Sequence, residues 1–275
     1  SIPNEYDKLM AAIGAEGTNA YTSTDVTCYV EDIPSNQLEN WAKIQADRFK
    51  HNVIRGFHTE LETVYEEKNM SLTQDTRKLY EAMFSSLFKH HPYGTQTVLG
   101  TQEHLKNPSI TNIKNYYKKW YVPNNMAICM SGDFDFDEAM DVIEKYFGDM
   151  QPNPELEMLS FEPEAEITEP IVKEVLGLEA ERVALAWRFP GEASDEALML
   201  GIVDLIMNNG MAGLIDLNLL QDQKLLSAYS FPYGQSDYTA YFMQGTPKEG
   251  QSLDEVKELL LAQIEALRKG EWDET

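Results

Sequence analysis

The segment from Glu60 to Met70 reads Glu-Leu-Glu-Thr-Val-Tyr-Glu-Glu-Lys-Asn-Met and places four carboxylates within eight residues. It contains no Gly or Pro, so a helix can run through it without interruption. At 3.6 residues per turn, Glu60, Val64 and Glu67 fall on one face of that helix. By spacing alone, such a pattern is most often a solvated charged face, and the alternative is a carboxylate pair kept for a site. The sequence on either side has to decide between them.

The composition narrows the class of protein before any motif is considered. With 275 residues, 43% hydrophobic and 11% aromatic, the chain can build one large domain or two ordinary ones. It carries 22 basic and 46 acidic side chains, a formal net charge of −24. Binding to nucleic acid or to an anionic membrane surface requires clustered Lys and Arg, so this charge argues against both partners. It suits a cationic or neutral peptide partner.

Cys28 and Cys129 lie in apolar, strand-like contexts without Cys-x-x-Cys spacing. We expect two buried core residues, with a disulfide as the less favoured alternative. No apolar run approaches the ~18 residues of a membrane span, and no basic-then-apolar signal opens the chain. Because the sequence begins at Ser1-Ile-Pro3 without Met, we expect a piece of a longer protein.

Hydrophobic periodicity and end signals predict an alternation of helices and strands. Helices are expected over Asn4–Ile13, from Ser35 as N-cap to Phe49, over Thr59–Ser71 and Arg77–Phe88, from Ser109 or Thr111 to Trp120, and over Phe136–Phe147, Ser194–Met207, Gly213–Gln221 and Leu253–Arg268. Strands are expected over Asn19–Val30 with a bend near Asp25, Asn125–Met130 as a buried strand, Val172–Leu178, Arg182–Phe189, Ala228–Tyr233 and Thr239–Thr246.

The composition changes between residues 151 and 170, where four prolines alternate with six glutamates. This pattern predicts an extended, self-repelling acidic linker between a domain over 1–150 and a second over 171–275. Both parts follow the same order of strands, central helices, strands and a closing helix, without a repeat at the level of residues. We therefore expect an α+β fold of two related sandwich domains, each a mostly antiparallel sheet with helices packed on one side.

Several kinds of chemistry have little support in the sequence. There is no Gly-x-Ser-x-Gly, no Gly-x-Gly-x-x-Gly and no Gly-Lys-Ser/Thr, which argues against a serine hydrolase and a phosphate-binding loop. The five histidines never occur as His-x-x-His, His-Glu-x-x-His or His-x-x-Glu-His, so no helix presents two imidazoles on one face. His90 and His91 suit a helix C-terminus, where they would complement the dipole, and His58 is expected on the surface.

Metal binding is the better candidate, although this chain cannot complete a site. Glu67 could supply one carboxylate ligand and Glu60 a supporting carboxylate. A catalytic zinc takes three protein ligands and a water, so two ligands would have to come from outside this sequence. Glu62 and Glu66 face other directions and are expected to be solvated.

Specific stretches occur together in a recognisable order. They are Gly17–Tyr29 with its Asn-Ala-Tyr-Thr strand, Glu60-x6-Glu67, His91-Pro-Tyr-Gly94 followed by Gly100-Thr101, Tyr116–Tyr121 with Pro123-Asn-Asn-Met126, and Ser131-Gly-Asp133. In this order they resemble the pitrilysin/insulinase-type zinc peptidases, the inverzincins, whose signature is His-x-x-Glu-His followed on a second helix by Glu-x6-Glu. Less specifically, Gly213–Leu220 and Leu226–Ser230 resemble the second, non-catalytic domain of that fold.

The resemblance implies roles for individual residues and a fold like that of mitochondrial processing peptidase. Glu67 would be the third zinc ligand and Glu60 the carboxylate that supports it. Asn19, Ala20 and Tyr21 would lie on the strand against which a peptide substrate aligns by β-augmentation. The implied activity is metalloendopeptidase hydrolysis of peptides through a zinc-activated water, with the general base inside His-x-x-Glu-His. The implied compartments are the bacterial periplasm or cell envelope and the cytoplasm.

This chain lacks His-x-x-Glu-His, which in the family stands a short way before the position of Ser1. We expect a chain that begins just after the motif, and that alone neither holds zinc tightly nor hydrolyses peptides. Its expected partners are a peptide or unfolded polypeptide and the rest of the parent chain or a homologous subunit. Two alternatives remain: a non-catalytic subunit or scaffold of the same fold, and an acidic globular protein whose Glu-rich helix is only a solvated face.

Overall fold

A computed structural model describes residues 4–54, 56–106 and 108–272, and its chain forms two compact units. The first unit contains the residues up to Ser71 together with Thr97–Phe161, and the second contains Leu72–Gln96 together with the residues from Glu162 onward. The α+β class expected from the sequence is confirmed. The contacts place residues 72–96 in the second unit, whereas the sequence boundary put them in 1–150. The domain limits 1–150, 151–170 and 171–275 stay a prediction.

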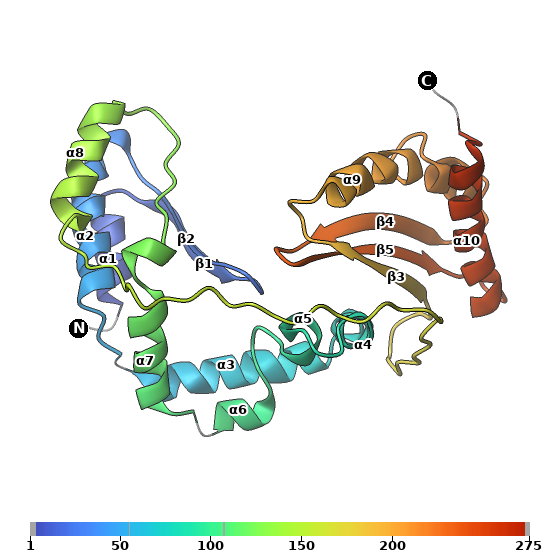
Figure 1. The fold of residues 1–275 in the computed structure, drawn as a ribbon, viewed down its shortest axis with the longest axis horizontal. Coiled ribbons are helices and arrows are strands. Elements are labelled where there is room, and N and C mark those ends of the chain that lie inside the picture. The colour runs from blue at the N-terminus through green and yellow to red at the C-terminus, as the bar shows by residue number, and fades with distance from the viewer. Residues whose placement is uncertain (1–3, 55, 107, 273–275) are drawn as a thin grey trace. The chain divides into compact units, whose positions relative to one another are not determined.

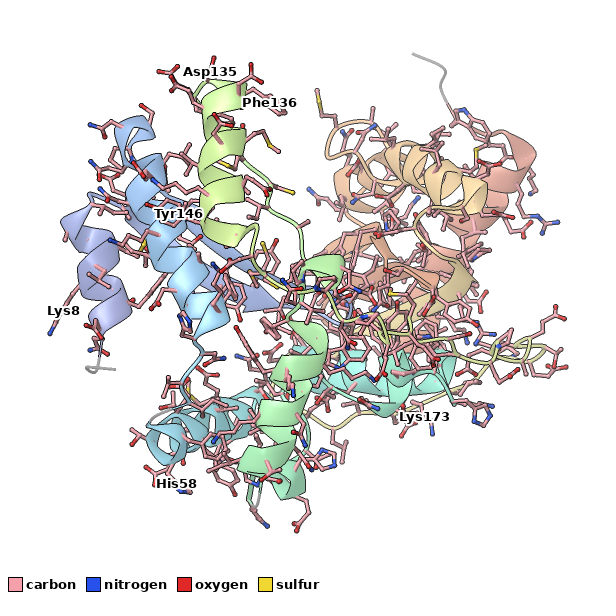
Figure 2. The ribbon with its side chains drawn as sticks, turned by 60° about the vertical axis from the view of Figure 1, so that its left-hand side comes forward. Lys8, His58, Asp135, Phe136, Tyr146 and Lys173 are labelled. Carbon is pink, nitrogen blue, oxygen red and sulfur yellow. The ribbon has the colours of Figure 1, made fainter. Side chains whose placement is uncertain are left out.

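The first unit combines helices with one two-stranded sheet (Figure 1). Its elements are α1 (Glu5–Ala12), β1 (Glu16–Thr22), β2 (Thr27–Asp32), η1 (Ser35–Gln37), α2 (Leu38–Lys50), α3 (Phe57–Leu72), α6 (Gln102–Lys106), α7 (Ile110–Trp120), η2 (Pro123–Asn125) and α8 (Phe136–Phe147). Helices α2 and α8 pack against each other. Asp135 begins α8 by accepting the N–H groups of Asp137 and Glu138, each at 3.0 Å, and lies at the helix end labelled in Figure 2.

The single bent strand expected over Asn19–Val30 is an antiparallel hairpin of β1 and β2. The bend near Asp25 is a turn that closes where the Ser23 N–H donates to the Val26 carbonyl at 2.8 Å. The register shifts between Glu16 and Asn19, next to Gly17, whose φ of 68° is easy for glycine only. The hairpin pairs with no third strand within the described residues.

The buried strand expected over Asn125–Met130 was wrong. Asn125 ends the 3-10 helix η2, residues 126–130 pair with no strand in the described part of the chain, and Ile128 and Cys129 are exposed. An apolar run becomes a strand only when a neighbouring backbone takes up its N–H and C=O groups, and the first unit supplies no such neighbour here. The expected burial of both cysteines was wrong as well, since Cys28 is only half-buried; both are free thiols.

The second unit is built on a three-stranded antiparallel sheet of order β3-β5-β4. Its elements are α4 (Asp75–Leu87), α5 (Pro92–Thr95), β3 (Val183–Pro190), α9 (Asp195–Met207), the π-helix η3 (Asp216–Gln221), β4 (Ser227–Gly234), β5 (Tyr238–Thr246) and α10 (Leu253–Lys269). Ser194 begins α9 and Ser252 begins α10, the latter as a capping box with Glu255.

Helices cover both faces of this sheet, so the expectation of helices on one side was wrong for the second unit. On β5, Tyr241 and Met243 point to the core that includes α9 and α10, while Ala240 and Phe242 point to the core that includes α4. Phe242 makes edge or tilted ring contacts with Tyr80 and Phe84. Because α4 covers the second face, both alternating sets of β5 side chains are buried.

The strand expected over Val172–Leu178 is absent from the structure. Leu176 and Leu178 are 91% and 98% exposed. The N–H groups of Leu178 and Glu179 donate to the carboxylate of Asp75 rather than to another strand. These bonds, the one from Glu179 foremost, lower the pKa of Asp75. The carboxylate of Asp75, from a distant part of the sequence, takes the place of the sheet partner that the segment would need.

The acidic segment over 151–170 is anchored at Glu164 rather than free along its length. This side chain is 2% exposed, and its Oε1 accepts the N–H groups of His90 and His91 at 2.6 Å and 2.7 Å. The Arg188 guanidinium lies 4.0 Å from the carboxylate and donates to the carbonyls of Leu87 and Ala165. Burial raises the pKa of Glu164, but the backbone N–H groups and Arg188 outweigh it and hold the pKa below its usual range.

Replacing Glu164 by Gln should lower the free energy of unfolding by about 1–3 kcal/mol at pH 7, because the backbone N–H groups lose an ionised acceptor. The fold lowers the pKa of Glu164 from its ordinary 4.5, so the stabilisation is present above that pH. It disappears as acid protonates Glu164 in the folded chain. Urea unfolding of both chains at pH 7 and at successively lower pH measures the difference.

The matched control is Glu166→Gln, which removes an exposed carboxylate two residues further along the same segment. It should leave stability at pH 7 nearly unchanged. If Glu164→Gln and Glu166→Gln unfold alike at every pH, the anchoring role of Glu164 is wrong.

Candidate active site

Helix α3 carries the two carboxylates that the sequence singled out. Its buried residues, Lys68 and Ser71, define the side that packs inward. Glu60 and Glu67 are separated by about 20° around the helix and about 10 Å along it, and both border that packed side. Glu62 and Glu66 lie on the solvent side, as expected. The helical period therefore places Glu60 and Glu67 at the border of the packed side, and Glu62 and Glu66 on the solvent side.

Both carboxylates are open to a ligand. Glu60 and Glu67 are exposed, and neither forms an ion pair or side-chain hydrogen bond with any described residue. A carboxylate oxygen is a suitable zinc ligand, so Glu67 fits the donor set of a catalytic zinc. Within residues 4–54, 56–106 and 108–272, no group of three or more His, Cys, Asp and Glu side chains lies close enough to hold a metal.

The residues predicted to bind a peptide substrate lie in β1. Asn19, Ala20 and Tyr21 are exposed, and β1 pairs with β2 along one edge only within the described part of the chain. A free strand edge presents backbone N–H and C=O groups that an extended peptide can use. One of these donors is already engaged, since the Ala20 N–H donates to Asn19 Oδ1 at 2.8 Å. Tyr21 lies opposite Cys28, and the hydrogen bond with that thiol raises the pKa of Tyr21.

The structure groups the candidate residues by element but does not join the two groups. Glu60 and Glu67 share α3, and Asn19 to Tyr21 share β1, both within the first unit. Within the described residues, α3 and β1 have no substantial packing against each other. His58 is exposed at the start of α3, as expected (Figure 2).

His91 is the residue that the sequence reading placed in the wrong role. It is 2% exposed and begins α5 by accepting the Tyr93 N–H on Nδ1 at 3.3 Å. Since Nδ1 is the acceptor, the proton is on Nε2, which donates to Asp237 Oδ2 at 3.0 Å. His91 therefore fixes a loop in the second unit rather than complementing the dipole of α4. The following Pro92 was the available signal, because proline favours the first position of a helix.

A second group missed by the sequence reading surrounds a pocket in the first unit that includes Lys114, Tyr117 and Lys118. Its signal was the distribution of charge: residues 104–132 contain no Asp or Glu, although the chain has 46 of them. A local reversal of charge in a strongly acidic chain is a feature that composition averaged over the whole sequence conceals.

Comparisons with known proteins identify the family. A family model described as the Peptidase M16 inactive domain matches residues 109–275. The chain therefore belongs to the M16 peptidase family, the pitrilysin-type zinc proteases, and the resemblance seen in the sequence is confirmed. The matched domain is the inactive type, and the match begins within what the sequence reading assigned to the first domain.

Curated relatives agree with this assignment. The uncharacterized zinc protease YmxG of Bacillus subtilis is 26% identical over 271 residues, which cover 94% of this chain and 62% of that protein. The uncharacterized zinc protease ML0855 of Mycobacterium leprae is 27% identical over 139 residues, covering 50% and 31%. The probable mitochondrial-processing peptidase subunit beta of Schizosaccharomyces pombe is 26% identical over 140 residues, covering 50% and 30%.

The fold also matches solved structures. A protease from Helicobacter pylori superposes with a TM-score of 0.83 at 21% identity, covering 98% of this chain and 67% of that one. The periplasmic protease PqqL from Escherichia coli superposes with a TM-score of 0.70 at 16% identity, covering 97% and 33%. At these identities the likeness concerns the fold. The chain spans between 30% and 62% of the length of the three curated relatives above. None of the helices in the described ranges is long and apolar enough to cross a membrane.

Zinc titrated into the purified 275-residue chain should bind weakly and be lost on dialysis, because one carboxylate ligand without two imidazoles leaves most of the coordination to water. Metal analysis after dialysis measures the retained zinc. Glu67→Gln should retain the same small amount as the unaltered chain. Retention of one zinc per chain that disappears in Glu67→Gln would show that the chain holds a complete site.

Proposed function

We propose that this chain is part of a zinc-dependent metalloendopeptidase that hydrolyses peptides or unfolded proteins. The observation that carries the proposal is the pair of exposed carboxylates, Glu60 and Glu67, on the margin of α3, neither of which has a side-chain partner among the described residues. Membership of the M16 family and the zinc-protease names of its relatives support the same conclusion. Zinc, when bound, would supply an activated water for attack on the scissile carbonyl.

In this proposal Glu67 is the third protein ligand of the zinc. Its carboxylate is exposed and has no competing cation among the described residues, so binding a metal would not require an existing ion pair to be broken. Glu60 acts as a supporting carboxylate, whose negative charge at the same margin of α3 favours a bound cation and helps to orient the metal's other ligands. Two imidazole ligands and the general base would come from residues outside these 275.

The edge of β1 would bind the substrate. An extended peptide could add to β1 at Asn19, Ala20 and Tyr21, using main-chain hydrogen bonds that accept many sequences. The bond from the Ala20 N–H to Asn19 Oδ1 would then be exchanged for a bond to the peptide, so Asn19 keeps that donor satisfied until substrate arrives. The exposed ring of Tyr21 would be available to the substrate's side chains.

A partner subunit, or further segments of a longer chain, would complete the active enzyme. The relatives are longer than this chain, and one is named as the beta subunit of a processing peptidase. The exposed apolar segment that includes Met126 and Ile128 supports a further covering element in the first unit. A peptide partner also fits the net charge of −24, which disfavours nucleic acid.

The second candidate function is a non-catalytic subunit or scaffold of the same fold. It is favoured by one observation, the match of residues 109–275 to the inactive type of M16 domain. The two candidates differ in whether Glu67 binds a metal, so the substitution Glu67→Gln distinguishes them.

In the longer protein that contains this chain, Glu67→Gln should reduce zinc content to a small fraction and peptidase activity by about 100-fold or more, because an amide replaces an anionic ligand. Zinc is measured by metal analysis and activity with a quenched fluorescent peptide. Glu66→Gln is the matched control, since it removes the neighbouring carboxylate from the solvent side of α3, and should leave both unchanged. If both variants keep zinc and activity alike, Glu67 is not a ligand and the proposal is wrong.

A further inference from the structure

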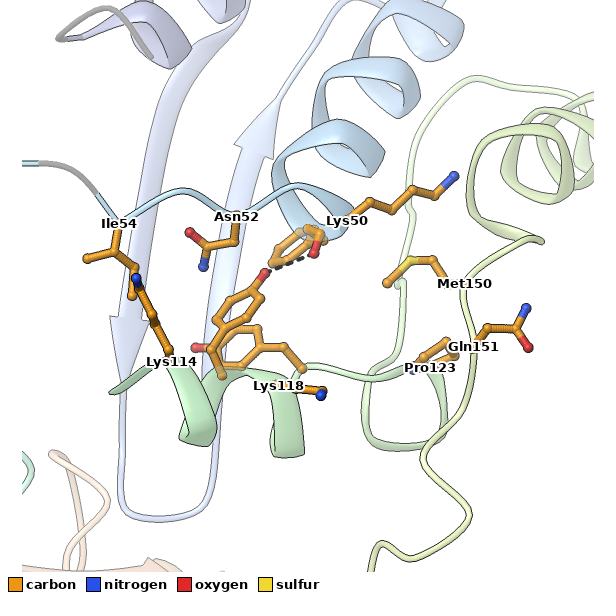
Figure 3. Close-up of a pocket in the computed structure, with 11 residues that line it drawn as sticks. Lys50, Asn52, Ile54, Lys114, Lys118, Pro123, Met150 and Gln151 are labelled. Atoms are coloured by element: carbon orange, nitrogen blue, oxygen red, sulfur yellow. Dashed lines mark hydrogen bonds between the residues drawn. The ribbon is translucent and has the colours of Figure 1, made fainter. Parts of the chain in front are cut away.

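A pocket of about 420 Å³ opens in the first unit between the end of α2, helix α7 and the segment after α8 (Figure 3). Its volume lies in the range of small-molecule sites. The pocket combines an apolar floor with cations at its rim. The lining residues that matter below are Phe49, Lys50, Lys114, Tyr117, Lys118 and Tyr121.

The floor of the pocket is a fixed stack of aromatic rings. Tyr117 and Tyr121 stack with centroids 4.2 Å apart at 15°, and Phe49 stacks on Tyr121 at 6.4 Å and 23°. The Tyr117 hydroxyl donates to the Phe49 carbonyl at 3.2 Å, the bond drawn as a dashed line in Figure 3. The Tyr121 hydroxyl is also hydrogen-bonded, to Tyr29 at 3.1 Å. Rings held in this way offer a flat apolar surface that needs little ordering when a ligand binds.

The rim of the pocket carries three lysines, two of which have no ionic partner among the described residues. Lys50 pairs with Asp149, but Lys114 and Lys118 form no ion pair with any described residue. They lie four residues apart on α7, and their side chains run in different directions along the pocket (Figure 3). Lys118 is in the last turn and gains from the helix dipole, whereas Lys114 is in the middle and does not. The helix itself contains no carboxylate, in a chain with 46 acidic and 22 basic side chains.

We propose that this pocket binds a carboxylate attached to a flat apolar group, with the ring packed on Tyr117 and Tyr121 and the carboxylate at one of the two lysines of α7, Lys114 or Lys118. Stacking accounts for the aromatic floor, and the carboxylate supplies an ionic partner for a lysine that has none among the described residues. Such a group could belong to a free aromatic acid or to the C-terminus of a peptide that ends in an aromatic residue. Both have the same recognition chemistry, and neither requires zinc or peptidase activity.

The test compares matched ligands by nuclear magnetic resonance titration of the purified 275-residue chain. The probes are 2-naphthoate, its neutral counterpart 2-naphthamide, and the tripeptide Gly-Gly-Phe with a free or an amidated C-terminus. For ligands this small we expect a dissociation constant of about 1 mM for the acids. The acids should bind at least fivefold more tightly than the neutral forms, and shifts should centre on Asn52, Tyr117 and Tyr121. The tighter of the two acids indicates the source of the natural ligand.

The variant Lys114→Gln/Lys118→Gln should weaken 2-naphthoate at least fivefold and remove its preference over the amide. The control Lys43→Gln/Lys257→Gln removes two helical lysines outside the pocket and should bind like the unaltered chain. Circular dichroism verifies that both variants fold. Equal binding of acid and amide, no binding of either acid, or unchanged binding by the Lys114/Lys118 variant would each overturn the proposal.

Discussion

The burial of β5 on both faces is the constraint on which the second unit depends. A three-stranded sheet with one bare apolar face would expose Ala240 and Phe242 to water, and helix α4 prevents this by packing Tyr80 and Phe84 against Phe242. The covering helix comes from residues far earlier in the chain than the sheet itself. The sheet is therefore complete only when a segment that precedes the acidic linker folds onto strands that follow it.

The hydrogen bonds of Glu164 and Arg188 support the same arrangement. The Glu164 carboxylate binds backbone N–H groups just after α4, and Arg188 on β3 reaches both the end of α4 and the linker carbonyl at Ala165. A buried carboxylate is stable only when such donors surround it. Hydrogen bonds to charged groups thus join three segments: the residues just after α4, strand β3 and the segment around Glu164.

The sequence predicted elements well where the signal was local. Periodicity together with the closing Gly148 predicted the limits of α8, and the helix expected from Ser194 is α9, which Ser194 caps. The same-face placement of Glu60 and Glu67 also follows from helical geometry. Prediction failed over 125–130 and 172–178, because an apolar run reports a preference for burial but not whether another strand is present to pair with it. The role of His91 and the lysines of the pocket depend on tertiary contacts, and the sequence marked them only indirectly, through Pro92 and through the absence of Asp and Glu over 104–132.

The chain passes between the two units three times, after Ser71, after Gln96 and after Phe161. Each unit is therefore built from two separate stretches of the sequence, although it is compact in space. A single cut in the acidic linker would leave α4 on one piece and the sheet that it covers on the other. The two pieces would have to remain associated for Phe242 to stay shielded from water. A recombinant segment that starts at residue 109, where the family match begins, would lack helix α4 altogether.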